Sequence, residues 1–311
     1  MSESTTLLFN APLPADHRSG FVAIIGKPNV GKSTLLNTWM GFKIAAVSPK
    51  PQTTRNRLLG ILTQASSQVI FIDTPGIHQP RSKLADFMVS TALGALREAD
   101  VILFLVDGSE PLSQADRAIA GYCAQTQAPV ILVLNKTDVH SADDSIRQDY
   151  EALGSWNQVA AISALKGTGC QELFSCVIDL LPLGPRFYPE DQTTDQQERF
   201  IAAELIREQA LKLLEQEVPH ALAVVVDEFK ERENGITFIA ATILCEKDSH
   251  KGIIIGKGGA KVKQIGQQSR LELEKLLLGK VFLELWVKVR ANWRQDDRIL
   301  RDLGYSLPDD K

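Results

Sequence analysis

The sequence predicts an α/β domain with a mostly parallel sheet, followed by a smaller α+β domain. Through about the first 180 residues, short β-branched apolar runs alternate with helical patterns. A proline-rich break at Pro182–Pro189 follows, and the order of strands and helices changes after it. A chain of 311 residues, with 44% hydrophobic and 23% charged residues, is long and apolar enough for two soluble domains.

The strands of the first domain are nearly continuous apolar runs, which is typical of strands buried on both faces. We expect them at Phe21–Gly26, Val69–Asp73, Val101–Asp107 and Val130–Asn135, with a last strand closed by Ser163. A weaker strand at Asn56–Gln64 is expected to pair antiparallel with Val69–Asp73. The sheet therefore has six strands. Helical patterns lie between them at Lys32–Met40, Phe87–Arg97, Ala115–Gln125, Ser145–Leu153 and Gln171–Leu181.

The second domain has a different order of elements. We expect a helix at Glu198–Glu217, strands at Ala221–Phe229 and Ile236–Cys245, a short helix, a glycine-rich turn, a helix at Ala260–Leu278 and a strand at Val281–Val289. The predicted division is a loose tail at 1–19, the first domain at 20–181, a linker at 182–197, the second domain at 198–305 and a tail at 306–311.

Charge is distributed unevenly along the chain. Residues 251–301 hold twelve Lys and Arg against five Asp and Glu, which gives this segment a net charge of +7. Because the whole chain has a net charge of −4, the remaining residues carry −11. This asymmetry favours an electropositive module that binds nucleic acid, although a solvated helix face would give a similar count.

Composition also excludes several classes of protein. The sequence has no apolar run of the roughly 18–20 residues that span a bilayer and no secretory signal pattern at its start. Cys123, Cys170, Cys176 and Cys245 show no zinc-binding spacing. We therefore interpret them as core residues in a reducing compartment.

A phosphate-binding loop follows the first strand and opens the first helix. It has the pattern G-x-x-x-x-G-K-S and consists of Gly26, Lys27, Pro28, Asn29, Val30, Gly31, Lys32 and Ser33. The glycines permit a tight loop whose N–H groups face phosphate oxygens. We expect Lys32 to contact the β- and γ-phosphates and the Ser33 hydroxyl to bind Mg²⁺.

Two further segments are expected to respond to the γ-phosphate. One ends a strand and consists of Asp73, Thr74, Pro75, Gly76 and Ile77, where Asp73 is a candidate Mg²⁺ ligand and Gly76 N–H can meet the γ-phosphate. The other is the loop that contains Gln52, Thr53, Thr54 and Arg55. Thr54 is the predicted Mg²⁺ ligand there, and Thr53 is the alternative.

The residues Asn135, Lys136, Thr137 and Asp138 predict the base. The Asp138 carboxylate can accept hydrogen bonds from guanine N1–H and its amino group, whereas adenine presents a lone pair at N1. Asn135 is expected to brace neighbouring loops, and the Lys136 stem to cover the base. The closing segment Ser163, Ala164 and Leu165 can offer a backbone N–H to guanine O6.

A glycine-rich turn marks the second site. Gly256, Lys257, Gly258 and Gly259 fit G-x-x-G and lie in the basic segment between two expected helices. Such a turn grips a sugar–phosphate backbone while an adjacent groove takes single-stranded bases. The candidate RNA-binding residues are Ile255, Gly256, Lys257, Gly258, Gly259, Lys261 and Lys263. We expect Trp293 to be packed in the interior and not stacked on a base.

The nucleotide motifs resemble those of the small GTPase superfamily, and the order of elements in the second domain matches a type II KH domain. With P-x-N-x-G-K-S, Q-T-T-R, D-T-P-G, N-K-x-D, G-K-G-G and V-x-V-x-x-x-W-R, the chain closely resembles the bacterial Era family over about residues 20–305. The resemblance implies a GTPase that binds the 3′ end of 16S ribosomal RNA and acts in small-subunit maturation. It also implies a cytoplasmic location, with peripheral association at the inner membrane face.

The sequence departs from Ras-like members of the superfamily at Ile77, where those members carry a catalytic glutamine. Ile77 cannot orient water, and His78 is interpreted as a solvated loop residue. In some families with a hydrophobic residue here, an Asn at the position of Asn29 places a K⁺ ion, so K⁺-assisted hydrolysis is a hypothesis. We expect a monomer.

Two alternatives remain open from sequence. The chain can be a constitutive RNA-binding protein whose guanine nucleotide is structural and rarely hydrolysed. An ATP-dependent kinase would use the same phosphate loop, but the segment from Asn135 to Asp138 argues against it.

Overall fold

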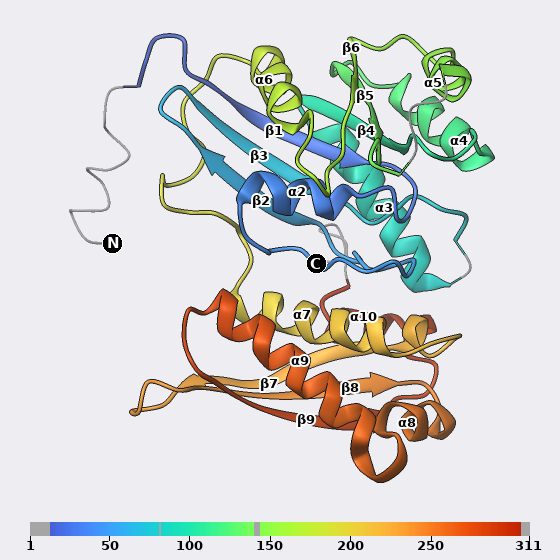
Figure 1. The fold of residues 1–311 in the computed structure, drawn as a ribbon, viewed down its shortest axis with the longest axis vertical. Coiled ribbons are helices and arrows are strands. Elements are labelled where there is room, and N and C mark those ends of the chain that lie inside the picture. The colour runs from blue at the N-terminus through green and yellow to red at the C-terminus, as the bar shows by residue number, and fades with distance from the viewer. Residues whose placement is uncertain (1–12, 81, 140–143, 306–311) are drawn as a thin grey trace. The chain divides into compact units, whose positions relative to one another are not determined.

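The computed structural model describes residues 13–80, 82–139 and 144–305 (Figure 1). The chain forms two compact units. The first comprises residues up to Gly41, Thr54–Gln79 and Met88–Asp195. The second comprises Phe42–Thr53, Pro80–Phe87 and the residues from Gln196 onward. The predicted tails at 1–19 and 306–311 lie outside the described residues, apart from residues 13–19.

The first unit contains the predicted six-stranded sheet. Its strands are β1 Arg18–Ile25, β2 Leu58–Thr63, β3 Ser67–Asp73, β4 Val101–Asp107, β5 Val130–Asn135 and β6 Gln158–Ala161. The order across the sheet is β2-β3-β1-β4-β5-β6. Strand β2 is antiparallel to β3, as expected, and every other pairing in this sheet is parallel.

Helices cover both faces of this sheet (Figure 1). They are α2 Lys32–Met40, α3 Lys83–Glu98, α4 Gln114–Cys123, α5 Asp144–Glu151 and α6 Cys170–Leu180. On one face, Ile70 and Ile72 share a buried core with residues of α3, α4 and α5. On the other, Phe71 stacks on Trp39 of α2 at 4.6 Å and approaches Phe174 of α6. Both faces of the strands are thus buried, which explains their continuous apolar runs.

Some element ends differ from the sequence prediction by a few residues. β1 begins at Arg18, before Phe21, because Arg18 N–H donates to Ser66 O and Ser19 N–H donates to Pro182 O. α3 begins at Lys83 instead of Phe87, and the Ser82 side chain accepts from Ala85 N–H at its start. Ends of this kind depend on local hydrogen bonds more than on apolar periodicity.

The segment between the last helix of the first unit and Asp195 is bonded to the sheet. The Gln68 side chain accepts from the N–H groups of Phe187 and Tyr188 at 2.7 and 2.9 Å and donates to Tyr188 O at 2.8 Å. Thr194 donates to Leu59 O at 2.7 Å. This part of the chain therefore belongs to the first unit.

The second unit contains a three-stranded sheet of β7 Ala223–Glu231, β8 Thr237–Cys245 and β9 Val281–Val289, in the order β7-β8-β9. The β7–β8 pair is antiparallel and the β8–β9 pair is parallel. Its helices are α7 Glu198–Leu213, α8 Asp248–Ile255, α9 Ala260–Leu276 and α10 Asp297–Asp302, and one-turn helices lie at Pro219–Ala221, Lys257–Gly259 and Trp293–Gln295. The core includes Ile206, Ile243, Ile254 and Leu273. Trp293 is fully buried and donates to Ala221 O at 3.0 Å, so the expectation that it is packed is confirmed.

None of the helices in the described part of the chain combines the length and the apolar character that a membrane span requires.

Candidate functional site

The phosphate-binding loop joins the end of β1 to the start of α2. Gly31 caps α2 with φ 101°, in the region that favours glycine, and an added Cβ would lie 2.2 Å from Asn135 Nδ2. Asn135 Nδ2 donates to Val30 O at 2.7 Å, and Ala164 N–H donates to Asn135 Oδ1 at 2.9 Å. The buried Asn135 amide thus connects the loop to the segment after β6, which is the bracing role predicted from sequence.

Lys32 lies inside this loop. Its ammonium is buried and donates to the carbonyl oxygens of Gly26 and Lys27 at 3.1 and 3.0 Å. Burial lowers the Lys32 pKa to about 8, against the opposing charge of Asp73. The Lys32 ammonium therefore has little solvation to lose when an anionic phosphate enters the loop.

Three oxygen ligands meet beside Lys32. Ser33 Oγ donates to Asp73 Oδ2 at 2.6 Å and lies 2.9 Å from Thr54 Oγ1. Asp73 is fully buried, and its second oxygen, Oδ1, has no hydrogen-bond partner among the described residues. Burial raises the Asp73 pKa to about 6, although the Ser33 hydroxyl and the Lys32 charge oppose this shift. Two hydroxyls and a carboxylate with a spare buried oxygen fit a Mg²⁺ ion, which prefers oxygen ligands.

The two candidate threonines point to different partners. Thr54 Oγ1 lies at Ser33, as given above, whereas Thr53 Oγ1 donates to Lys50 O at 2.7 Å within its own loop. Gln52 has a positive φ of 61° immediately before them. Arg55, the last residue of the predicted segment, is buried. This geometry favours Thr54 over Thr53 as the metal ligand.

The segment Asp73–Ile77 lies against the phosphate-binding loop. Thr74 Oγ1 donates to Ile24 O at 2.7 Å, and Ile77 N–H donates to Gly26 O at 3.2 Å. An added Cβ on Gly76 would lie 2.5 Å from Pro28 N, so only glycine permits this approach. The Ile77 side chain is buried. This alkyl side chain has no polar group that could orient an attacking water.

The residues predicted to recognise the base lie at the carboxyl end of β5. Asp138 is exposed and accepts from Ser163 Oγ at 2.5 Å. Thr137 N–H donates to Ile162 O at 3.2 Å, which joins this turn to the segment after β6. Leu165 is 73% exposed, next to the buried Ala164. The segment around Asp138 and the segment Ser163–Leu165, far apart in sequence, are thus brought together at one edge of the sheet.

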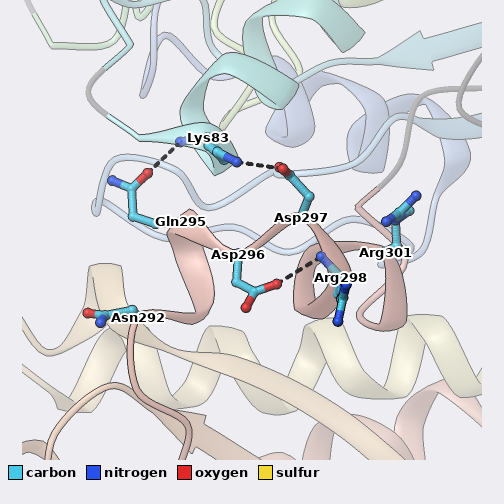
Figure 2. A pocket seen from close by; sticks show the side chains of 7 residues that line it. All are labelled: Lys83, Asn292, Gln295, Asp296, Asp297, Arg298 and Arg301. Atoms are coloured by element: carbon cyan, nitrogen blue, oxygen red, sulfur yellow. Dashed lines mark hydrogen bonds and ion pairs between the residues drawn. The ribbon is translucent and has the colours of Figure 1, made fainter.

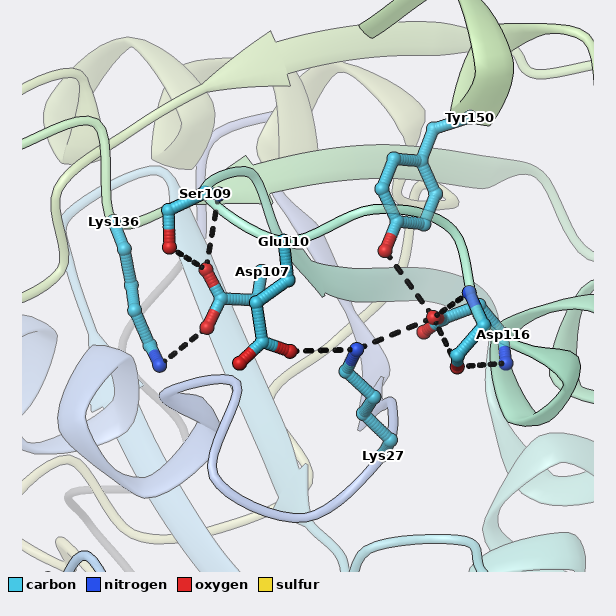
Figure 3. Close-up of polar contacts among 8 residues, drawn as sticks. Lys27, Asp107, Ser109, Glu110, Asp116, Lys136 and Tyr150 are labelled. Atoms are coloured by element: carbon cyan, nitrogen blue, oxygen red, sulfur yellow. Dashed lines mark hydrogen bonds and ion pairs between the residues drawn. The ribbon is translucent and has the colours of Figure 1, made fainter. Parts of the chain in front are cut away.

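Sequence reasoning missed the partner of Lys136. The Lys136 ammonium lies 2.5 Å from Asp107 Oδ2 at the end of β4 (Figure 3). Burial works to raise the Asp107 pKa, but hydrogen bonds from Lys136 and Ser109 outweigh it and hold the pKa below its ordinary value. The ion pair fixes the Lys136 stem beside the segment that contains Asp138. Asp107 ends a buried strand, and this position was the available signal.

A second missed network holds the Lys27 side chain. Its ammonium lies 3.1 Å from Glu110 Oε2 and 3.3 Å from Asp116 Oδ2 (Figure 3). The same Asp116 oxygen accepts from Tyr150 Oη at 3.2 Å and from Ser113 Oγ at 2.6 Å. Ser113 and Asp116 form a capping box at the start of α4. This buried carboxylate therefore links the phosphate-binding loop to α4 and α5.

The glycine-rich turn lies between α8 and α9. Gly256, Gly258 and Gly259 all have positive φ, and Lys257 and Lys263 are exposed. The Lys261 ammonium instead donates to Leu213 O at 3.2 Å, at the end of α7. Among the neighbouring isoleucines, Ile254 is buried in the core, Ile255 is half-buried and Ile253 is 49% exposed. The turn thus presents its backbone and Lys257 to solvent, and Lys263 in the first turn of α9 adds a second exposed basic side chain.

A polar hollow of about 440 Å³ lies elsewhere in the second unit (Figure 2). The Lys83 ammonium pairs with Asp297 at 2.5 Å, and Lys83 N–H donates to Gln295 Oε1 at 3.3 Å. Arg298 and Arg301 also line it. Sequence reasoning did not predict this hollow, because no motif marks its residues.

Two family models match the chain. One described as "50S ribosome-binding GTPase" matches residues 21–136, and one described as "KH domain" matches residues 217–294. The first contains the phosphate-binding loop and Asn135, and the second contains the glycine-rich turn.

Curated relatives are similar over nearly the whole chain. GTPase Era from Ruminiclostridium cellulolyticum is 50% identical over 291 residues, covering 93% of this chain and 98% of that protein. GTPase Era from Geobacter metallireducens is 51% identical over 292 residues, with coverages of 93% and 98%.

Two solved structures have a similar fold. Era in complex with MgGDPNP and nucleotides 1506–1542 of 16S ribosomal RNA has a TM-score of 0.88 and 40% identity, and the match covers 94% of this chain and all of that one (100%). A variant of Aquifex aeolicus Era bound to GDP.AlF4− has a TM-score of 0.87 and 41% identity, with coverages of 93% and 100%.

Proposed function

Because this chain belongs to the Era family of GTPases and hydrolyses GTP, we propose that it is a nucleotide switch that binds 16S ribosomal RNA near its 3′ end and assists maturation of the 30S ribosomal subunit. The observation that carries the proposal is the combination in one chain of a complete guanine-nucleotide site and an exposed G-x-x-G turn. The RNA bound to the relative described above supports the choice of RNA.

The nucleotide site assigns a role to each motif. The phosphate-binding loop from Gly26 to Ser33 would hold the phosphates with its N–H groups, and Lys32 would neutralise their charge. Asp138 would accept from guanine N1–H and its amino group while Ser163 holds one of its oxygens. Lys136, fixed by Asp107, would cover the base.

Mg²⁺ would be held by Ser33, Thr54 and Asp73. When bound, it supplies positive charge that offsets the charge developing on the phosphate oxygens. The spare buried oxygen of Asp73 supports this assignment, and the relative described above contains MgGDPNP. Loss of the γ-phosphate would release Thr54 and Gly76, which is the change that a switch requires.

The group that replaces the glutamine of Ras-like members is not a side chain at position 77, because Ile77 is buried. K⁺ placed by Asn29 is our candidate for that group. Faster turnover in K⁺ than in Na⁺ buffer supports it, and equal rates would exclude it.

The RNA site is tested with a double variant of the full chain, Lys257→Asp with Gly258→Asp. Placing two carboxylates in the turn should repel the sugar–phosphate backbone, so we expect RNA binding to fall at least about 100-fold while GTP hydrolysis stays unchanged. Binding is measured by fluorescence anisotropy with a labelled RNA from the 3′ end of 16S ribosomal RNA and with a shuffled RNA of equal composition.

A matched control carries one of the same charge changes on β7, Lys230→Asp, away from the turn. It should bind the RNA as the parent protein does. If the parent binds the 3′-end RNA and the shuffled RNA equally, the proposed ribosomal target is wrong. If the double variant binds as the parent does, the turn is not the RNA site.

A further inference from the structure

Twelve residues, Phe42–Thr53, separate α2 from Thr54, and they belong to the second compact unit, although Thr54 belongs to the first. The Gly41 cap ends α2 immediately before this segment. The chain that leads into Thr54 therefore makes its contacts in the second unit.

The carboxyl end of this segment is held by Arg207 of α7. The Arg207 guanidinium is fully buried and donates to Gln52 O at 3.3 Å and to Thr53 O. Arg207 Nε also donates to Glu204 Oε1 at 2.9 Å, one turn earlier on α7. The planar guanidinium thus reaches a carboxylate and two successive backbone carbonyls from three separate nitrogens, whereas a lysine ammonium has all its donors on one nitrogen.

The rest of the segment is held by the next residue of α7, Glu208. Its buried carboxylate accepts from the Lys43 ammonium at 2.7 Å and from Val47 N–H at 3.2 Å. The Lys43 ammonium also lies 2.9 Å from Glu272 of α9. Glu208 therefore holds the start and the middle of the segment, and Arg207 holds its end.

Buried charges of this kind are costly to retain for stability alone. Removing a charged side chain from water has a large desolvation cost, and apolar residues of similar volume often pack as well. Glu208 accepts from Lys43 and Val47 of the segment and pairs with Lys212 one turn away on α7. Arg207 donates to Gln52 O and Thr53 O of the segment and, with its other bonds, to Glu204. Both buried charges of α7 therefore bond directly to this segment.

We infer that Arg207 and Glu208 are positioning residues for GTP binding and hydrolysis, because they fix Phe42–Thr53 so that the Thr54 hydroxyl is presented to the metal of a bound triphosphate. The inference rests on the proposed role of Thr54. GDP has no γ-phosphate, so its binding does not require the Thr54 hydroxyl to bind the metal. Loosening the segment should therefore weaken triphosphate binding selectively.

The test uses the full chain with Arg207→Met and Arg207→Lys. We measure the affinities for a fluorescent GDP and a fluorescent non-hydrolysable GTP analogue in Mg²⁺ buffer, together with kcat and KM for GTP. For Arg207→Met we expect about tenfold weaker binding of the analogue, with GDP affinity changed less than about twofold. Arg207→Lys, which keeps the positive charge and the donors of a single nitrogen but loses the planar fork, should restore part of the loss. A purely structural role would lower both affinities together.

Arg199→Ala provides a matched control. Arg199 lies on the same helix and also donates to a backbone carbonyl, Asp227 O at 2.7 Å, but not to the segment. It should leave both affinities unchanged.

Lys43→Met loosens the same segment from its own side and serves if Arg207→Met does not fold. It should shift the ratio of the analogue and GDP affinities in the same direction. An unchanged ratio in Lys43→Met and in every Arg207 variant that folds would overturn the inference.

Thr54→Ala separates the inference from its premise. If Thr54→Ala weakens analogue binding while the Arg207 and Lys43 variants do not, the positioning role fails and the metal role of Thr54 stands. If Thr54→Ala has no effect, the metal role of Thr54 fails, and the positioning role fails with it.

Discussion

We propose that base selection depends on the Asp138 carboxylate at the carboxyl end of β5. One of its oxygens accepts from Ser163 at 2.5 Å, and the side chain is exposed, so it can accept from a base edge. Guanine offers two donors at this edge, whereas adenine offers an acceptor at N1. A carboxylate that faces an acceptor loses a hydrogen bond and gains a repulsion, which explains discrimination without a steric barrier.

Asp138→Asn should change the preferred base from guanine to xanthine, because the amide can donate where xanthine carries an oxygen. Loss of one or two hydrogen bonds to a charged group should weaken GTP binding about 10- to 100-fold. Competition of GTP, XTP and ATP for a fluorescent nucleotide measures the change. Asp149→Asn, on α5, serves as the control and should leave the preference intact. Retained guanine preference in Asp138→Asn would refute the assignment.

Glu272 makes the stability of the second unit depend on pH. Burial works to raise its pKa, but hydrogen bonds from Lys275 and Lys43 outweigh it and lower the pKa from 4.5 to about 2. A carboxyl group whose pKa is lower in the folded chain than in the unfolded chain stabilises the folded state at pH values above the unfolded-state pKa. The stabilisation is lost as the pH falls from about 4.5 towards about 2.

The stability difference between the parent protein and Glu272→Gln should therefore depend on pH. The parent should be more stable near pH 6, and the difference should shrink as the pH falls below about 4.5. Urea unfolding of both proteins at a series of pH values measures it. A difference that stays constant down to pH 3 would show that the ion pairs of Glu272 do not contribute.

Single residues differ in how well sequence could predict them. The nucleotide motifs have fixed spacing between named residue types, so their positions follow directly from the sequence. Arg207 has no such signal, because its partner Thr53 is 154 residues away and is contacted through a backbone carbonyl that any residue carries. Lys261 was predicted to bind RNA, yet its ammonium bonds to Leu213 O, so its contribution to RNA binding stays a prediction.

Among the elements, α4 and α5 are joined to the phosphate-binding loop through one buried side chain. Asp116 of α4 accepts from Tyr150 of α5 and pairs with Lys27 of the loop. Burial raises the pKa of the Tyr150 hydroxyl, and the Asp116 charge adds to this effect, so the hydroxyl stays protonated and donates. The network should stabilise the packing of both helices on the sheet.

Tyr150→Phe should destabilise the first unit by about 1–3 kcal/mol, because the buried Asp116 carboxylate loses a donor while the ring packing is retained. Thermal or urea unfolding of the nucleotide-free chain measures this loss. Tyr122→Phe, on the exposed face of α4, should change stability by less than about 0.5 kcal/mol. An equal effect of the two substitutions would mean that the network contributes nothing to stability.

Apolar periodicity predicted the type and order of nearly all elements, including the antiparallel β2. It predicted their ends less well. α7 was expected to reach Glu217 but ends at Leu213, because Leu214 adopts an extended backbone and the one-turn helix Pro219–Ala221 follows. Helix ends of this kind are set by backbone conformation and packing, which a window of apolar residues does not contain.

At the scale of the whole molecule, the chain combines a site that binds and hydrolyses GTP with a KH domain in which residues 251–301 carry a net charge of +7. The segment Phe42–Thr53 belongs to the second unit and is followed directly in the chain by Thr54, the proposed metal ligand in the first unit. The polypeptide chain therefore connects the second unit to the proposed nucleotide site at this residue. Sequence could predict both domains from their motifs. It could not predict that this segment would be bonded to α7, because that depends on tertiary contacts between distant residues.

The central claim is that the bound nucleotide controls RNA binding, and one measurement tests it most directly. The affinity of the full chain for RNA from the 3′ end of 16S ribosomal RNA is measured with saturating GDP and with a saturating non-hydrolysable GTP analogue, both in Mg²⁺. The account predicts about tenfold tighter binding with the analogue, which corresponds to an ordinary coupling free energy between two sites. Equal affinities would contradict it and would favour a constitutive RNA-binding protein.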